Sequence, residues 1–158
     1  MTTQGLQTSV ATEIVVPAPA ERAFQVFTEM GTWWPRGHHV IEPGFAETVL
    51  EPFEGGRVYD RGVDGDECCW ARVIAFEPPS RILLRWELTP QWQVEDDPDR
   101  CSEVEVRFIA EGPDRTRVEL EHRELQRHGE GWEGKRDAVG SDGGWPEILR
   151  SYAGRFAA

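Results

Sequence analysis

The sequence predicts one α+β domain in which an antiparallel sheet is covered on one face by a C-terminal helix. A strand and a helix open the chain, and its middle consists of short alternating segments separated by turns rich in Gly, Pro and Asp. An amphipathic helical stripe closes it. Because 158 residues can bury a substantial core, a single domain spanning residues 1–158 accounts for the whole chain.

The first predicted strand is Val10–Val16, where side chains alternate in character, and it follows polar residues 1–7, which we expect to be loosely held. Two prolines then end the strand and open a helix that stops at Gly31. The apolar face of this helix, at spacings of three and four residues, is Ala20, Ala23, Phe24, Phe27 and Met30. Residues 32–44 lack periodicity, which suits a short second helix or a packed loop.

Six further segments alternate as strands do, and the short turns between them predict antiparallel pairing. They are residues 46–51, 56–61, 67–77, 81–89, 102–111 and 116–125. In the last two, Val106, Phe108, Leu120 and His122 fall on one face, whereas the intervening positions are mostly Glu and Arg. One face of the sheet is therefore expected to be apolar and covered, and the other to be a charged lattice in water.

The last part of the chain predicts the helix that covers the sheet. Residues 128–144 are Gly-rich, with a helical segment expected at 133–139. A single helical stripe follows, with a proline suited to its first turn. The stripe consists of Trp145, Ile148, Leu149, Tyr152 and Phe156.

Composition excludes several classes of function. The chain carries 29 acidic and 17 basic side chains, a net charge of −12, which argues against a nucleic-acid partner because phosphate binding needs Lys and Arg. It has no apolar run of membrane-spanning length and no signal peptide, so we expect a cytoplasmic protein with no membrane partner.

Three cysteines, two of them adjacent on a strand, suit ordinary thiols. His38 and His39 lack a third ligand, so we expect neither a metal nor a cofactor.

Several local motifs, taken in order, carry a resemblance to a known family. They are residues 19–24 (PAERAF), 33–35 (WWP), 54–57 (EGGR), 76–79 (FEPP), 116–123 (TRVELEHR) and 144–146 (GWP). This order resembles the SRPBCC, or START-like (Bet v-like), helix-grip superfamily, and within it the branch related to the C-terminal domain of Aha-type activators of the ninety-kilodalton heat-shock protein ATPase. The resemblance implies a curved six- to seven-stranded antiparallel sheet wrapped around a long C-terminal helix, with one or two short helices after the first strand.

The resemblance also implies a cavity between the sheet and the C-terminal helix, which holds a hydrophobic ligand in many relatives. Combining this with strand parity and the helical stripe gives a set of candidate cavity residues, although the same side chains could simply fill a core. The candidates are Trp34, His39, Leu84, Trp86, Val106, Phe108, Leu120, His122, Trp145, Leu149 and Tyr152.

His122 is the most informative polar residue of this set, because it shares a face with Val118 and Leu120. Its simplest interpretation is a core histidine with one hydrogen bond. Burial would keep the imidazole neutral, so that it could offer one donor and one acceptor to a ligand. It is also the candidate for a catalytic residue.

Three hypotheses for function follow. The leading one is a domain that binds a small apolar or aromatic molecule, oriented by His122, Tyr152 and one or more tryptophans. The second is an enzyme of the polyketide cyclase or dehydratase kind, with His122 as general acid or base. The third is a chaperone-partner domain, with a heat-shock chaperone as partner, and the sequence leaves a homodimer open as well.

Overall fold

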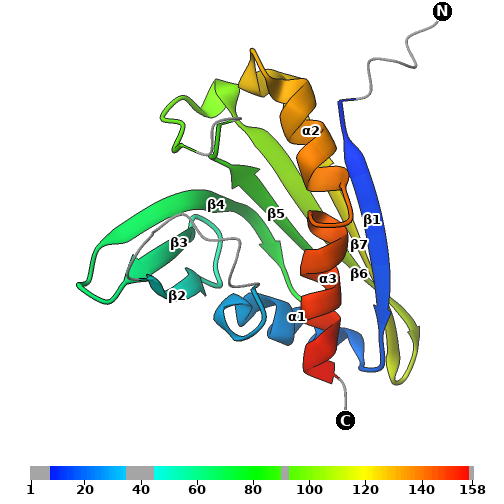
Figure 1. Ribbon diagram of the computed structural model, residues 1–158. Helices are drawn as coiled ribbons and strands as arrows, with labels where there is room; N and C mark the ends of the chain where they lie inside the picture. Colours follow the sequence, from blue (N-terminus) through cyan, green and yellow to red (C-terminus); the bar gives the residue numbers. More distant parts are fainter. Residues whose placement is uncertain (1–7, 35–44, 90–92, 157–158) are drawn as a thin grey trace, which may run out of the picture.

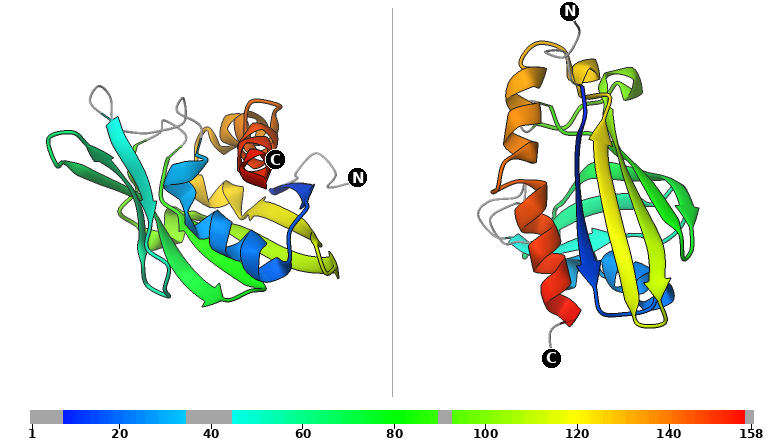
Figure 2. Two further views of the ribbon diagram at one scale, coloured as in Figure 1. Left: turned by 90° about the horizontal axis from the view of Figure 1, so that it is seen from below. Right: turned by 90° about the vertical axis from the view of Figure 1, so that its right-hand side faces the viewer.

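The computed structural model describes residues 8–34, 45–89 and 93–156. Its centre is one antiparallel sheet with the strand order β1-β7-β6-β5-β4-β3-β2 (Figure 1). The strands are β1 (Val10–Val16), β2 (Phe45–Leu50), β3 (Arg57–Gly62), β4 (Glu67–Glu77), β5 (Arg81–Trp86), β6 (Ser102–Gly112) and β7 (Arg115–Arg123). The register shifts within the β2–β3, β3–β4 and β4–β5 pairs, and irregularities of this kind bend a sheet. Seen from below, the sheet curls around its helices (Figure 2).

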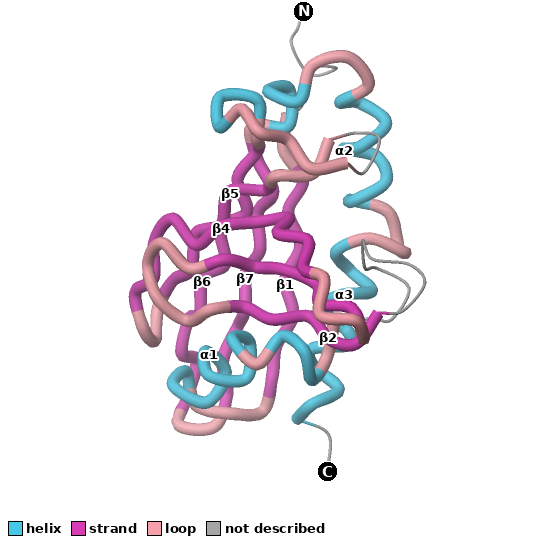
Figure 3. The backbone as a smooth tube through the Cα atoms, turned by 90° about the vertical axis from the view of Figure 1, so that its left-hand side faces the viewer, coloured by secondary structure: helices cyan, strands magenta, loops and turns pink. Residues whose placement is uncertain are grey.

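The helices lie on the concave face of the sheet. They are α1 (Ala20–Thr28), α2 (Trp132–Gly140) and α3 (Trp145–Ala153), with short 3-10 turns η2 (Met30–Thr32), η4 (Pro98–Arg100), η5 (Leu125–His128) and η6 (Gly154–Phe156). Figure 3 shows α1 across the lower end, with α2 above α3 along one side.

The C-terminal helical region is in two pieces because the chain turns between α2 and α3. At that turn a Cβ on Gly144 would lie 2.2 Å from the carbonyl oxygen of Val139, so only glycine allows this close approach. The turn places Trp145 at the start of α3, facing the sheet, where it is 3% exposed.

The inner face of the sheet forms the core with α1 and α3, as strand parity predicts. Residues 82, 84 and 86 of β5, residues 104, 106 and 108 of β6, and residues 118, 120 and 122 of β7 are all buried. The outer face is the expected charged lattice. At its centre the Glu105 carboxylate binds Arg81, Arg107 and Arg123. Burial alone would raise the pKa of Glu105, but hydrogen bonds from Arg81 and Arg123 outweigh it, and the pKa is lowered.

The predicted α+β fold and the order of its elements are confirmed, with small differences at the ends. β5 ends at Trp86 rather than at residue 89, and Leu88 then pairs with Val94 in an isolated bridge. The helical segment expected at residues 133–139 is α2. Within the described residues, no helix is long and apolar enough to cross a membrane.

Candidate ligand-binding site

Four indole rings form a closed cycle of contacts between the sheet and α3, which we call the tryptophan square. Trp34 follows η2, Trp70 lies on β4, Trp86 on β5 and Trp145 on α3. Ring centroids are 5.2 Å apart for Trp34 and Trp70, 5.1 Å for Trp70 and Trp86, 5.3 Å for Trp86 and Trp145, and 6.2 Å for Trp145 and Trp34. Trp34 is half-buried and the other three are buried, so the square has one side nearer to solvent.

A buried carboxylate fixes one corner of the square. Asp60 on β3 is 0% exposed, and its Oδ1 accepts a hydrogen bond from Trp70 Nε1 at 3.2 Å. The same oxygen accepts from the Thr48 hydroxyl at 2.8 Å. Because two donors meet a single buried oxygen, the Trp70 ring is held in one orientation.

A chain of hydrogen bonds, here called the histidine–serine network, adjoins the opposite corner. Trp145 Nε1 donates to His122 Nδ1 at 3.0 Å. His122 Nε2 lies 2.7 Å from Ser102 Oγ, which lies 2.7 Å from His128 Nε2. An indole nitrogen can only donate, so His122 Nδ1 is an acceptor and its Nε2 carries the proton. Ser102 then accepts from His122, and when its own hydroxyl proton is directed at His128 Nε2 that nitrogen accepts, so that the His128 proton lies on Nδ1.

Burial keeps this network neutral. It lowers the pKa of His122 well below the ordinary histidine value and that of His128 to about 4, and the charge on Lys135 acts in the same direction. Lys135 comes from α2, and burial lowers its pKa to about 7. Its Nζ donates to the carbonyl oxygen of Thr89 at 3.3 Å and lies 5.9 Å from the centroid of the Trp86 ring.

Two buried nitrogen atoms near the network have no hydrogen-bond partner among the described residues. Trp86 Nε1 and His128 Nδ1 make no hydrogen bond in the described part of the chain, although Trp86 is 4% and His128 is 3% exposed. An unpaired buried N–H group costs about 1–3 kcal/mol, so such groups usually indicate a bound water or ligand.

The structure brings together at the square four of the eleven residues that the sequence nominated. Trp34, Trp86, His122 and Trp145 meet at the square, while His39 lies outside the described residues. The remaining candidates are buried in the core between the sheet and the helices. They are Leu84, Val106, Phe108, Leu120, Leu149 and Tyr152.

Two of these candidates have more specific surroundings. The Tyr152 hydroxyl donates to the carbonyl oxygen of Ala23 at 2.7 Å, so it joins α3 to α1, and burial raises its pKa. Phe108 packs against the rings of Phe24 and Phe27 at the α1 end, with centroids 5.1 Å and 5.6 Å away. Tyr152 therefore holds α3 against α1, and Phe108 helps to hold α1 on the sheet.

Sequence reasoning missed Asp60, Ser102, His128 and Lys135, and left Trp70 unassigned. Strand parity could have placed Ser102, since it shares its face with Val104 and Val106. His128 and Lys135 lie in the Gly-rich stretch, where no periodicity indicates which side chains face inward.

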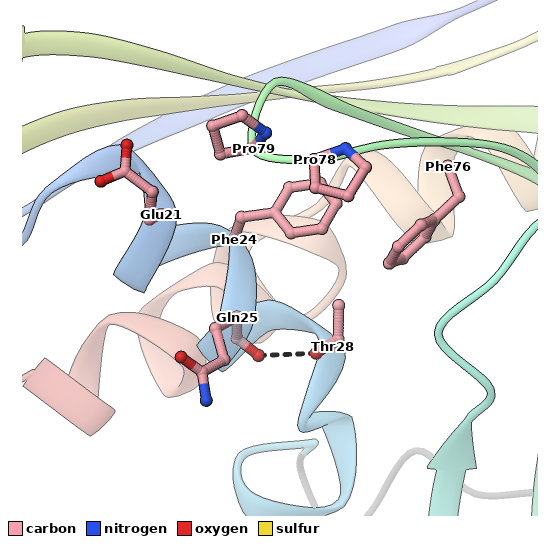
Figure 4. A pocket seen from close by; sticks show the side chains of 7 residues that line it. All are labelled: Glu21, Phe24, Gln25, Thr28, Phe76, Pro78 and Pro79. Atoms are coloured by element: carbon pink, nitrogen blue, oxygen red, sulfur yellow. Dashed lines mark hydrogen bonds between the residues drawn. The ribbon is translucent and has the colours of Figure 1, made fainter.

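A separate hollow of about 370 Å³ lies between α1 and the β4–β5 turn (Figure 4). It contains none of the side chains of the square or the network. Its lining is Glu21, Phe24, Gln25, Thr28, Phe76, Pro78 and Pro79.

A curled antiparallel sheet closed by a C-terminal helix over an aromatic interior defines a helix-grip domain of the SRPBCC superfamily. More narrowly, the chain belongs to the family described as Activator of Hsp90 ATPase homolog 1-like protein, whose pattern matches residues 17–156. Both the superfamily and the branch inferred from the local motifs are thereby confirmed.

Among solved structures, the anthrahydroquino-gamma-pyrone synthase Txn09 is 38% identical with a TM-score of 0.66, over 93% of this chain and 96% of that one. The self-sacrificing resistance protein CalC from Micromonospora echinospora is 28% identical with a TM-score of 0.66, over 95% and 94%. Protein NE0264 from Nitrosomonas europaea is 12% identical with a TM-score of 0.64, over 93% and 92%, and shares the fold. No curated protein matches the chain.

Proposed function

We propose that this protein binds a small planar aromatic molecule between the sheet and α3, at the tryptophan square. The observation that carries the proposal is the closed cycle of four indoles, which offers aromatic faces and edges from three elements and from the segment after η2. Aromatic pairs in offset or edge-to-face geometry gain about 0.5–1.5 kcal/mol beyond their buried area, so such a lining favours flat ring systems.

We expect the ligand to enter the square at Trp34. It is half-buried and lies outside regular helix or strand, whereas Trp70 and Trp86 are fixed on strands and Trp145 on α3. A ligand that takes the place of the Trp34 ring would contact Trp70 and Trp145, the two indoles of the square that Trp34 packs against. The name of one similar structure supports an aromatic ligand, since Txn09 is a synthase of an anthrahydroquino-gamma-pyrone.

The proposal is tested with xanthone, a planar tricyclic γ-pyrone, and with xanthene, which has the same rings but no carbonyl group. Titration of either compound should quench tryptophan fluorescence with saturation. Leu120→Phe adds volume at a position that is 1% exposed on the inner face and should weaken binding at least tenfold. Val15→Phe, on the opposite face of β1 and 36% exposed, is the matched control and should bind as the unmodified protein does. Absence of saturable quenching by both compounds would overturn the proposal.

A second function, an enzyme that closes a pyrone or related ring, is favoured by the 38% identity with a synthase. In such a reaction a phenolic oxygen attacks a ketone carbon, a C–O bond forms and water leaves. An ortho-hydroxyaryl β-diketone is a suitable probe because its γ-pyrone product is followed by absorbance. Turnover should be lost in His122→Gln, with the fold checked by circular dichroism, and unchanged turnover in this variant would exclude a catalytic role for His122.

A further inference from the structure

Two donors at the α2 end of the inner face point to a more specific kind of ligand. In the arrangement in which Ser102 donates to His128 Nε2, the His128 proton lies on Nδ1, and this nitrogen has no hydrogen-bond partner in the described chain. Trp86 Nε1 is the second such donor. Neither group can serve as an acceptor in this arrangement, so together they require an acceptor.

The two donors belong to one neighbourhood. Trp86 and Ser102 are directly paired across β5 and β6, and the Ser102 hydroxyl contacts the ring of His128 at 2.7 Å. The Trp86 ring also packs on His122, with centroids 5.3 Å apart. From the other side α2 brings Lys135 Nζ to 5.9 Å from the Trp86 ring. Strands β5 and β6, η5 and α2 thus come together at one position, the vicinity of these two donors.

We propose that this position binds a ring carbonyl oxygen of the aromatic ligand, with Trp86 Nε1–H and His128 Nδ1–H as donors and Lys135 beside them. The proposal rests on the ligand-binding function above. It adds which polar group of the ligand the protein recognises. A neutral carbonyl fits better than a carboxylate, because both imidazoles are neutral and transfer of a charged group into a buried site is costly. A hydrocarbon of the same shape would leave both donors unpaired.

Xanthone and xanthene test the carbonyl directly, because they differ at the carbonyl position. In equilibrium dialysis, two neutral hydrogen bonds should make xanthone bind about tenfold more tightly than xanthene. The ratio of the two dissociation constants is the readout, since changes in local packing or in protein stability should affect both compounds alike. Trp86→Phe and His128→Phe should each lower this ratio about threefold.

Trp132→Phe is the matched control, because Trp132 lies at the start of α2 against Arg136 and outside the square, and the ratio should be unchanged. Equal binding of xanthone and xanthene would overturn the carbonyl site and indicate that water occupies the two donors, while leaving the proposed function intact. A ratio that persists in both Trp86→Phe and His128→Phe would overturn the assignment of the donors. Failure of both compounds to bind would instead refute the proposed function.

Discussion

Acidification should destabilise this protein between pH 7 and pH 5 through its two buried histidines. The unfolded chain binds a proton at each imidazole near the ordinary pKa of 6.5, whereas His128 in the folded protein does so only near pH 4. Because the unfolded state binds more protons in this window, stability falls as the pH falls. For His128 the loss from pH 7 to pH 5 is about 2 kcal/mol, and His122, whose pKa is also lowered, adds to it in the same direction.

Urea unfolding monitored by tryptophan fluorescence at several pH values measures this loss. His128→Gln should reduce the pH dependence by about 2 kcal/mol, since it removes one titrating group. Glu105→Gln is the control: its carboxyl has a lowered pKa, so its contribution is lost only as the pH falls through and below about 4.5. A stability that is constant from pH 7 to pH 5 would refute the buried neutral network. Titration of the His122 and His128 imidazoles near pH 6.5 by NMR would refute it as well.

Two other predictions concern the packing around the site, and both are measured as changes in the free energy of unfolding. Ser102→Ala leaves a donor on His122 and an acceptor on His128 unpaired, and should lower the free energy of unfolding by about 2–4 kcal/mol. A loss below about 0.5 kcal/mol would mean that water replaces the hydroxyl without cost. Gly144→Ala forces a Cβ against the Val139 carbonyl and should cost at least about 2 kcal/mol, whereas Gly143→Ala, with open space around its Cβ position, should change stability by less than about 0.5 kcal/mol. Equal effects of the two glycine variants would show that the close turn before α3 is absent.

Strand parity predicted the inner face of the sheet because one covered face imposes a period of two. His122 is fully buried and packs on the Trp86 ring, and its alternation with Glu121 and Arg123 indicates this inward position. The helical stripe likewise predicted that Trp145 and Tyr152 face inward. These parts of the site follow from local patterns.

The polar part of the site depends on contacts between distant segments, and local patterns do not contain them. His128 contacts Ser102, which lies 26 residues earlier in the sequence, and Asp60 accepts a hydrogen bond from Trp70 on the neighbouring strand. Lys135 looks like an ordinary surface residue in a Gly-rich stretch, yet α2 buries it against Trp86. The burial of Lys135 can be recognised only in the folded structure, where the turn at Gly144 and the curl of the sheet bring α2 over the strand ends.

The most direct test of ligand binding at the square is the NMR spectrum of the indole N–H groups of the seven tryptophans during titration with xanthone. We expect large shifts for Trp34, Trp70, Trp86 and Trp145, with the Trp86 N–H moving downfield as it gains a hydrogen bond, and no shift for Trp132. Shifts confined to Trp132, or a spectrum that xanthone leaves unchanged, would contradict ligand binding at the square.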